Sequence, residues 1–307
     1  MTSTDTTPAP AGPAKAVPVK AVPVRHVGRT VAAVVVALLA LGLLWSLAKN
    51  PNLDWPTIGH YLFAELTLRG VLVTVELTVV SMVIGTVGGV VVAIMRLSDN
   101  YVLRWVAIAY VWFFRGTPVL VQLIFWGYLG AFYPRTTLGI PFTDVTFFDE
   151  RTSTLVTATT AAILGLALNE IAYAAEIVRG GIQSVSPGQR EAAASLGLSP
   201  AVTMRKVVLP QAMRVIVPPM GNEVITMLKT TALVSVIAGK DLLTNLQQVY
   251  SQNFRVIPLL VVASIWYLAM VTVLGLAQSR LERRFGRGFS SARAAAPAAV
   301  SIPTDAR

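Results

Sequence analysis

The residues of this chain that could do chemistry are mainly polar groups set inside apolar stretches. One group follows a helical spacing and consists of Asn169, Glu170, Tyr173 and Glu176. Positions three or four apart lie on one face of a helix, so these side chains would share a side. Ionisable groups inside apolar helices are costly and usually face a cavity or a partner charge. Such a face could bind the ammonium group or side chain of an amino acid.

Each carboxylate of this group has a second interpretation, as part of a structural ion-pair network. Glu176 lies near the end of its apolar run, where Arg179 or Arg115 could pair with it, and we favour the network for this residue. Glu170 lies deeper in the run, and for it both interpretations stay open.

A second polar strip lies in the apolar run 215–238 and contains Asn222, Glu223 and Lys229. Glu223 and Lys229 are six residues apart, so they are not adjacent on a straight helix, and each is expected to meet another helix. We take the two strips together as candidate residues of a substrate pathway.

Other kinds of site are excluded by what the sequence lacks. The chain has no cysteine and only two histidines, and neither histidine has a partner at a metal-ligand spacing. We therefore expect no bound metal. The pair Gly239-Lys240 is followed by Asp241 rather than by Ser or Thr, so there is no phosphate-binding P-loop. No Ser/His/Asp set or zinc-protease motif is present, which ranks an enzyme last.

The composition places these residues in a membrane. Charged residues make up 13% of the 307 and hydrophobic residues 54%, with a mean hydropathy of +0.65. A soluble domain has roughly 25% charged residues, and a disordered chain is poor in apolar ones. A membrane helix needs about 20 mostly apolar residues. Six stretches qualify, and they are 31–48, 70–95, 105–132, 154–178, 215–238 and 256–277.

The distribution of basic residues predicts the orientation. The segments 1–30, 96–115, 179–214 and 280–307 together carry 18 of the 25 Lys and Arg residues. By the positive-inside rule these segments are cytoplasmic, and so are both termini. Residues 1–30 are rich in proline and read as a disordered basic tail that could touch anionic lipid. Residues 31–48 are an N-terminal anchor, and residues 281–307 are a second cytoplasmic tail.

The longest cytoplasmic loop predicts two short helices. Ser186 is a good N-cap, Pro187 suits the first helical position, and Gln189 can close a capping box. Residues 190–196 are then helical, and Gly197 ends the helix. Ser199-Pro200 begins a second helix by the same logic, which we expect Pro210 to disrupt. Three alanines give the first helix a small face that can fit a partner's groove, and they are Ala192, Ala193 and Ala194.

The same loop carries a recognisable pattern. Glu191-Ala192-Ala193, Gly197 and residues 207–210 follow the order EAA-x3-G-x9-I-x-LP, with Val207 at the Ile position. This resembles the coupling loop of type I ABC importer permeases. Residues 114–122, 172–182 and 219–237 are similar to the polar amino acid uptake subfamily, except that Ala232 stands where we expect Ser. The signature positions in the first of these segments are Arg115, Gly116, Thr117, Pro118 and Gln122.

The resemblance covers about residues 66–280 and implies a fold and partners. The expected fold is an all-α integral membrane protein with about six transmembrane helices, a five-helix core plus the anchor, in the bacterial cytoplasmic membrane. A second permease subunit, the same chain or a homologue, would complete the channel. A separate ATP-binding subunit would hold ATP and Mg²⁺, and an extracytoplasmic binding protein would deliver a polar amino acid. No nucleic acid partner is expected.

Coupling to the ATPase is implied for the loop 186–210. The residues concerned are Glu191, Ala192, Ala193, Gly197, Leu209 and Pro210. The loop helices would sit in a cleft of the ATPase, whose closure drags the membrane helices. Glu191 is the residue we expect to make a polar contact there. Its alternative role is electrostatic support of the first turn of its own helix.

Three points stay open. An ion-coupled secondary transporter would also use intramembrane carboxylates, but no second half-repeat is visible and the loop would have no purpose there. The identity of the amino acid does not follow from the residues, although carboxylates favour a cationic one. Gly85 and Gly89 form a G-x-x-x-G pair, which we interpret as close helix packing within the fold rather than a dimer contact.

Overall fold

The computed structural model describes residues 27–140 and 145–285, which form two compact units that divide between Pro51 and Asn52. The expected tails at 1–30 and 281–307 therefore lie mostly outside the described residues. The parts that are described belong to helices, because α1 begins at Val27 and α13 continues to Phe285.

The first unit is dominated by α1 (Val27–Ala48), which begins four residues before the predicted anchor. From Val31 to Trp45 its side chains are apolar around the whole helix, and none of its apolar window is buried within the unit. A helix that is apolar on every side is suited to lipid rather than to a water-facing surface.

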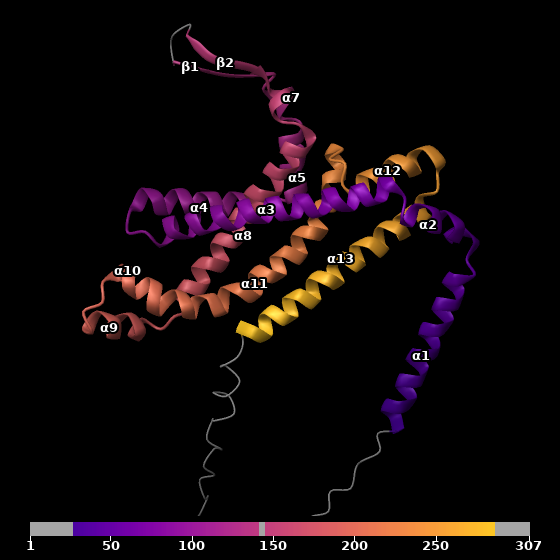
Figure 1. The fold of residues 1–307 in the computed structure, drawn as a ribbon, viewed down its shortest axis with the longest axis horizontal. Helices are drawn as coiled ribbons and strands as arrows, with labels where there is room; N and C mark the ends of the chain where they lie inside the picture. Colours follow the sequence, from indigo (N-terminus) through magenta and orange to yellow (C-terminus); the bar gives the residue numbers. More distant parts are fainter. Residues whose placement is uncertain (1–26, 141–144, 286–307) are drawn as a thin grey trace, which may run out of the picture. The chain divides into compact units, whose positions relative to one another are not determined.

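The remaining elements follow one another from a short 3-10 turn to a long C-terminal helix (Figure 1). Before the loop 186–210 they are η1 (Pro51–Leu53), α2 (Trp55–Leu62), α3 (Glu65–Leu97), α4 (Tyr101–Gly116), α5 (Val119–Gly127), α6 (Leu129–Phe132), β1 (Arg135–Gly139), β2 (Thr146–Arg151), α7 (Thr152–Leu155) and α8 (Ala158–Gln183). After it begins they are α9 (Pro187–Ser195), α10 (Pro200–Thr203), η2 (Met204–Val208), α11 (Leu209–Thr230), η3 (Thr231–Ile237), α12 (Leu242–Asn253) and α13 (Val256–Phe285).

Four described helices are long and apolar enough to cross a membrane, namely α1, α3, α8 and α13. A fifth span is possible if α4 and α5 together count as one. These two helices meet at 97°, so the apolar run 105–132 is bent where Arg115 before Gly116-Thr117-Pro118 predicts a helix break, and its crossing of the membrane as one span stays a prediction. The break falls at Thr117-Pro118, because a proline lacks the N–H that would continue the helix. The count of six stays a prediction.

A helix forms where the fifth span is predicted, but its ends differ from the prediction. α11 begins at Leu209, and the chain then continues as the 3-10 helix η3 up to Ala238. Pro218 and Pro219 lie inside α11 without ending it. The polar residues of this helix keep it from qualifying as a span by composition alone, which agrees with a helix that faces protein or water.

The expectation of an all-α fold is wrong for residues 135–139 and 146–151, which form two strands. β1 and β2 pair antiparallel, with Leu138 opposite Phe148 and an irregularity after Leu138. The two strands contain threonines and phenylalanines, which favour extended backbone. This local preference predicts strands, but by its position the segment is expected only to connect two spans. This hairpin stands away from the helices in Figure 1.

The centre of the second unit is the long contact between α3 and α8. It depends on glycines of α3: a Cβ at Gly85 would lie 2.3 Å from Cγ of Glu170, and one at Gly89 would lie 2.5 Å from Cβ of Ala174. The prediction that this G-x-x-x-G pair serves packing within the fold is confirmed. Small residues let two helix backbones approach closely without a gap between them.

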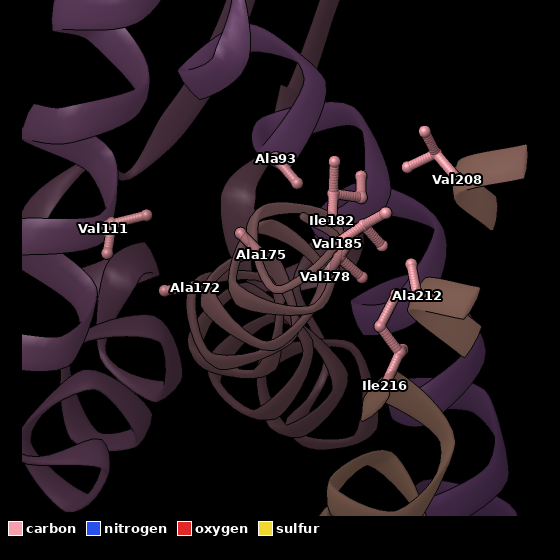
Figure 2. Packing of buried hydrophobic residues seen from close by; sticks show 10 residues of the cluster. All are labelled: Ala93, Val111, Ala172, Ala175, Val178, Ile182, Val185, Val208, Ala212 and Ile216. Carbon is pink, nitrogen blue, oxygen red and sulfur yellow. The ribbon is translucent and has the colours of Figure 1, made fainter. Parts of the chain in front are cut away.

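A buried apolar cluster joins α8 to three other helices. Its side chains come from α3, α4, α8, the segment after α8, η2 and α11, and Figure 2 shows them arranged around α8. The members are Ala93, Val111, Ala172, Ala175, Val178, Ile182, Val185, Val208, Ala212 and Ile216. Alanine and valine predominate, so the helices lie close together and hold the polar face of α8 in a fixed position.

Gly89→Ala is expected to destabilise the protein by about 1–3 kcal/mol, because the added methyl group has no space between α3 and α8. The measurement is the free energy of unfolding in detergent. Gly275→Ala is the matched control: nothing lies within 4 Å of its added carbon, so we expect no loss or a small gain. Equal effects of the two substitutions would contradict the close-packing interpretation.

Candidate functional site

A cavity of about 510 Å³ opens where the α4–α5 bend meets α8 and α11. Glu170 and Tyr173 line it from α8, Glu223 lines it from α11, and Arg115 lines it from the end of α4. The further lining residues are Gly116, Thr117, Pro118, Val119, Leu166, Asn169, Thr226, Met227 and Thr230. The structure thus brings three residues of the first predicted strip, one residue of the second and part of the signature segment to one place.

The bend that forms one wall is held by amide side chains. Breaking the helix at Pro118 leaves carbonyl groups at the end of α4 without backbone partners. Gln122 Nε2 donates to the carbonyl of Phe114 at 3.0 Å and to Thr117 Oγ1 at 2.8 Å. Asn169 Nδ2 from α8 donates to the same Phe114 carbonyl at 2.8 Å. The amide group of Asn169 is therefore engaged in holding the bend to α8.

The carboxylate of Glu170 is buried against α3, and Glu170 is 4% exposed. Its Oε1 atom has no hydrogen-bond partner among the described residues, although buried polar atoms are nearly always paired. Glu223 lies across the same cavity. Two carboxylates thus lie beside one cavity, and one of them has an unpaired oxygen. A positively charged group bound there would stabilise their negative charges.

Arg115 provides positive charge at the same cavity. Its guanidinium lies 5.1 Å from the centre of the Tyr173 ring, which is within cation–π range. Its nearest carboxylate oxygen belongs to Glu176, at 3.9 Å. The cavity therefore combines negative groups from α8 and α11 with one positive group from α4, and these could hold the two charges of an amino acid.

Glu176 itself belongs to a cluster of arginines rather than to the cavity lining. Arg96 Nη1 donates to Glu176 Oε1 at 2.6 Å, and Arg179 Nη2 lies 2.8 Å from Glu176 Oε2. With Arg115 nearby, three arginines from α3, α4 and α8 share this carboxylate. The structural network favoured for Glu176 is confirmed. Arg96 was missed because sequence spacing does not show which residue of α3 faces α8.

The three residues of the second predicted strip lie on different faces of α11. Glu223 faces the cavity, whereas Asn222 and Lys229 are exposed and do not line it. The other α11 residues at the cavity lie three, four and seven positions after Glu223, which is the spacing of one helical face. That periodicity was available in the sequence and could have identified Thr226 and Thr230.

The loop 186–210 forms α9 with the predicted ends, since Ser186 is the N-cap residue, Pro187 is the first helical residue and Gly197 follows the C-terminus, but the predicted capping box does not form. Gly197 has a φ of +74°, and its N–H donates to the carbonyl of Ala194 at 2.9 Å. Leu198 N–H donates to the carbonyl of Ala193 at 3.1 Å, which completes a Schellman ending. The Ser186 side chain makes no capping hydrogen bond, so the expected capping box is absent.

The surface that α9 presents differs from the expected alanine face. Ala193 is buried, while Glu191, Ala192 and Ala194 are exposed. Leu196, at the end of the helix, is 80% exposed. The side exposed on α9 therefore combines one carboxylate, two small residues and one large apolar residue.

Pro210 does not end the second loop helix, contrary to the prediction. α10 passes through the π-helical turn η2 directly into α11, and Leu209 N–H donates to the carbonyl of Met204. A wider turn gives room for the proline ring, which would clash with the preceding turn of a regular α-helix. Leu209 and Pro210 thus lie at the start of α11 and connect this helix to the loop.

Comparison with known proteins decides the class of the molecule. Residues 85–287 match the family described as "Binding-protein-dependent transport system inner membrane component". The chain belongs to this family.

Named relatives of this permease are amino acid transport proteins. It is 43% identical over 264 residues to the arginine transport system permease protein ArgU of Corynebacterium glutamicum, covering 86% of this chain and 82% of that one. It is 32% identical over 230 residues to the glutamine transport system permease protein GlnP of Escherichia coli K12, covering 75% and 94%. These relatives are permeases rather than enzymes.

A solved structure shares the fold. A crystal structure of an amino acid ABC transporter with histidines superposes with a TM-score of 0.59 at 37% sequence identity, covering 71% of this chain and 94% of that one. Together with the apolar helices, the family identifies this permease as a multi-pass membrane protein and an ABC transporter permease for amino acids.

Proposed function

We propose that this permease moves a cationic amino acid into the cell through the cavity between α4, α8 and α11, driven by ATP hydrolysis on a partner subunit. The observation that carries the proposal is the meeting of Glu170 and Glu223 with Arg115 around one cavity. An amino acid carries a carboxylate and an ammonium group, and a cationic one carries a second positive charge. The positive and the negative side chains of the cavity then each have an oppositely charged group of the ligand to bind.

The relatives support the substrate class. One of them is named for arginine, whose guanidinium group would suit the unpaired oxygen of Glu170. In our proposal Arg115 receives the substrate's α-carboxylate, because its guanidinium is only weakly engaged by Glu176 at 3.9 Å. Glu170 and Glu223 receive the cationic side chain.

Energy would come from a separate ATPase that holds ATP and Mg²⁺ and binds the coupling loop. The exposed carboxylate of Glu191 and the exposed Leu196 give α9 a polar and an apolar contact for that subunit. Because η2 joins α10 to α11 without a break, movement of the loop would be passed to a helix that lines the cavity. The channel would be completed by a second permease chain, a copy or a homologue.

The orientation in the bacterial cytoplasmic membrane follows from charge. With the coupling loop cytoplasmic, both termini are cytoplasmic, and the segments around β1–β2 and α12 face outward. An extracytoplasmic binding protein would then deliver the amino acid on that outer side.

The test is purification of this permease in mild detergent, identification of the bound subunits, and assay of their ATPase activity in proteoliposomes. A bound ATPase that is stimulated by binding protein loaded with arginine or lysine, and not by empty binding protein, would support the proposal. Transport in vesicles without ATP and without a bound ATPase would contradict it and favour ion-coupled transport.

Glu191→Ala is expected to lower ATP-driven transport at least tenfold while leaving folding unchanged. The side chain is exposed and has no ion pair within residues 27–140 and 145–285, so its loss removes no stabilising contact there. Transport in proteoliposomes and thermal stability in detergent are the two measurements. Gln189→Ala, also exposed on α9, is the control that should transport normally. Normal transport by the Glu191 variant would assign this carboxylate to local helix electrostatics.

A further inference from the structure

The β1–β2 hairpin is the part of the described chain that the proposed transport cycle leaves without a role. Every residue of its two strands is exposed except Thr136, which is intermediate. Leu138 is 63% exposed and Phe147 is 74% exposed. A two-stranded hairpin is marginally stable by itself, and exposed large apolar side chains outside a membrane usually mark a binding surface.

The base of the hairpin is held firmly. Thr152 is 1% exposed, its N–H donates to the carbonyl of Pro134 at 3.1 Å, and its hydroxyl lies 2.9 Å from that of Thr136. Arg135 binds both carboxylate oxygens of Asp149, each at 2.8 Å. This hydrogen-bonded pair holds the pKa of Asp149 below its usual range, so the pair stays formed at neutral pH.

The base also connects two walls of the cavity. The hairpin follows α5 through α6 and precedes α8 through α7, and α6 and α7 pack closely where a Cβ at Gly130 would lie 3.2 Å from the nitrogen of Ser153. Val119 of α5 and Leu166 of α8 both line the cavity. A force applied to the hairpin would therefore reach both of these helices.

The hairpin and the coupling loop lie at opposite ends of α8. The hairpin precedes the first residue of that helix, Ala158, and α9 follows its last residue, Gln183. A 26-residue helix is about 39 Å long, which is enough to cross a bilayer. If the coupling loop is cytoplasmic, the hairpin is outside the cell.

We propose that the β1–β2 hairpin is a docking element for the extracytoplasmic binding protein, with Leu138 and Phe147 as its apolar contacts. This rests on the proposed function, which places the hairpin outside, and the family itself is described as binding-protein-dependent. The last three residues of β2 are Asp149, Glu150 and Arg151, and a charged strand of this kind is costly to bury in lipid. Apolar side chains beside charges of both signs suit a protein surface instead.

Cross-linking tests the occupant directly, because the chain has no cysteine and a single one can be introduced. Phe147→Cys carrying a benzophenone label, in the permease–ATPase complex in proteoliposomes, is expected to cross-link to purified binding protein added outside. Tyr101→Cys at the start of α4, which is 69% exposed and lies in a segment predicted to be cytoplasmic, should give no such product. The complex that contains the unaltered, cysteine-free permease chain measures background labelling. Cross-links only to lipid or only to the second permease chain would overturn the proposal.

A functional assay separates this proposal from the one on which it rests. The double variant Leu138→Ser/Phe147→Ser is expected to need at least ten times more loaded binding protein for half-maximal ATPase stimulation, with the maximal rate unchanged. Phe254→Ser, which removes an 84% exposed aromatic ring outside the hairpin, is the control and should behave as the unaltered complex. A normal response of the double variant contradicts the hairpin proposal alone. Absence of stimulation in the unaltered complex contradicts the proposed function as well.

Discussion

Glu176→Gln is expected to lower the free energy of unfolding of the permease by about 2–3 kcal/mol, the largest stability loss among the substitutions considered. Removing one partner of a buried ion pair typically costs 3–5 kcal/mol, and partial solvent access reduces that figure. The Glu176 side chain is 19% exposed, and it is shared by Arg96, Arg179 and Arg115. A glutamine keeps the shape but leaves three arginines close together without their negative charge.

The measurement is thermal unfolding of the purified permease in detergent, together with its amount in the membrane. Glu65→Gln is the matched control, since Glu65 also pairs with an arginine, Arg69, but both side chains are more than 70% exposed. Exposed pairs contribute about 0–1 kcal/mol, so this variant should unfold almost as the unaltered chain does. If both variants lose the same stability, the arginine cluster does not hold α3, α4 and α8 together.

Glu170→Gln is expected to reduce the transport efficiency for arginine or lysine by about 10–100-fold and to leave stability unchanged or slightly raised. A hydrogen bond between charged groups contributes about 1.5–3 kcal/mol, and each 1.4 kcal/mol is a factor of ten. The carboxylate oxygen Oε1 of Glu170 has no partner among the described residues, so the amide removes no internal bond of that atom.

The readouts are uptake of cationic and neutral amino acids in proteoliposomes and thermal stability. The loss should be selective, with neutral amino acids affected much less than cationic ones. Glu76→Gln replaces an exposed carboxylate of α3 and should leave both uptake and selectivity unchanged. Equal losses for cationic and neutral substrates would contradict a direct contact between Glu170 and the cationic group.

Glu170 and Glu176 differ in role although they are six residues apart on one helix. The sequence predicted that Glu176 belongs to an ion-pair network, because its place near arginines at the end of an apolar run was visible. It left Glu170 open, since burial of its carboxylate depends on Gly85 of α3 lying against it. Such a contact joins residues 85 positions apart in the chain and has no local signal.

Features that depend only on neighbouring residues could be predicted from the sequence alone. The apolar runs, the break at Pro118 and the helix ending at Gly197 each follow from a residue's own backbone or from helical spacing. The family resemblance also rested on short patterns, and the comparisons confirmed it.

Tertiary structure decided the features that depend on residues far apart in the chain. Local spacing fixes which residues share a helix face, but not which other helix lies against that face. Arg96 therefore became visible only when α3 packed on α8, and the cavity only when α11 closed it. Pro210 stays within a helix because the π turn before it widens the backbone. The physical reason is the same throughout: close packing over long sequence separations selects among the conformations that local preferences allow.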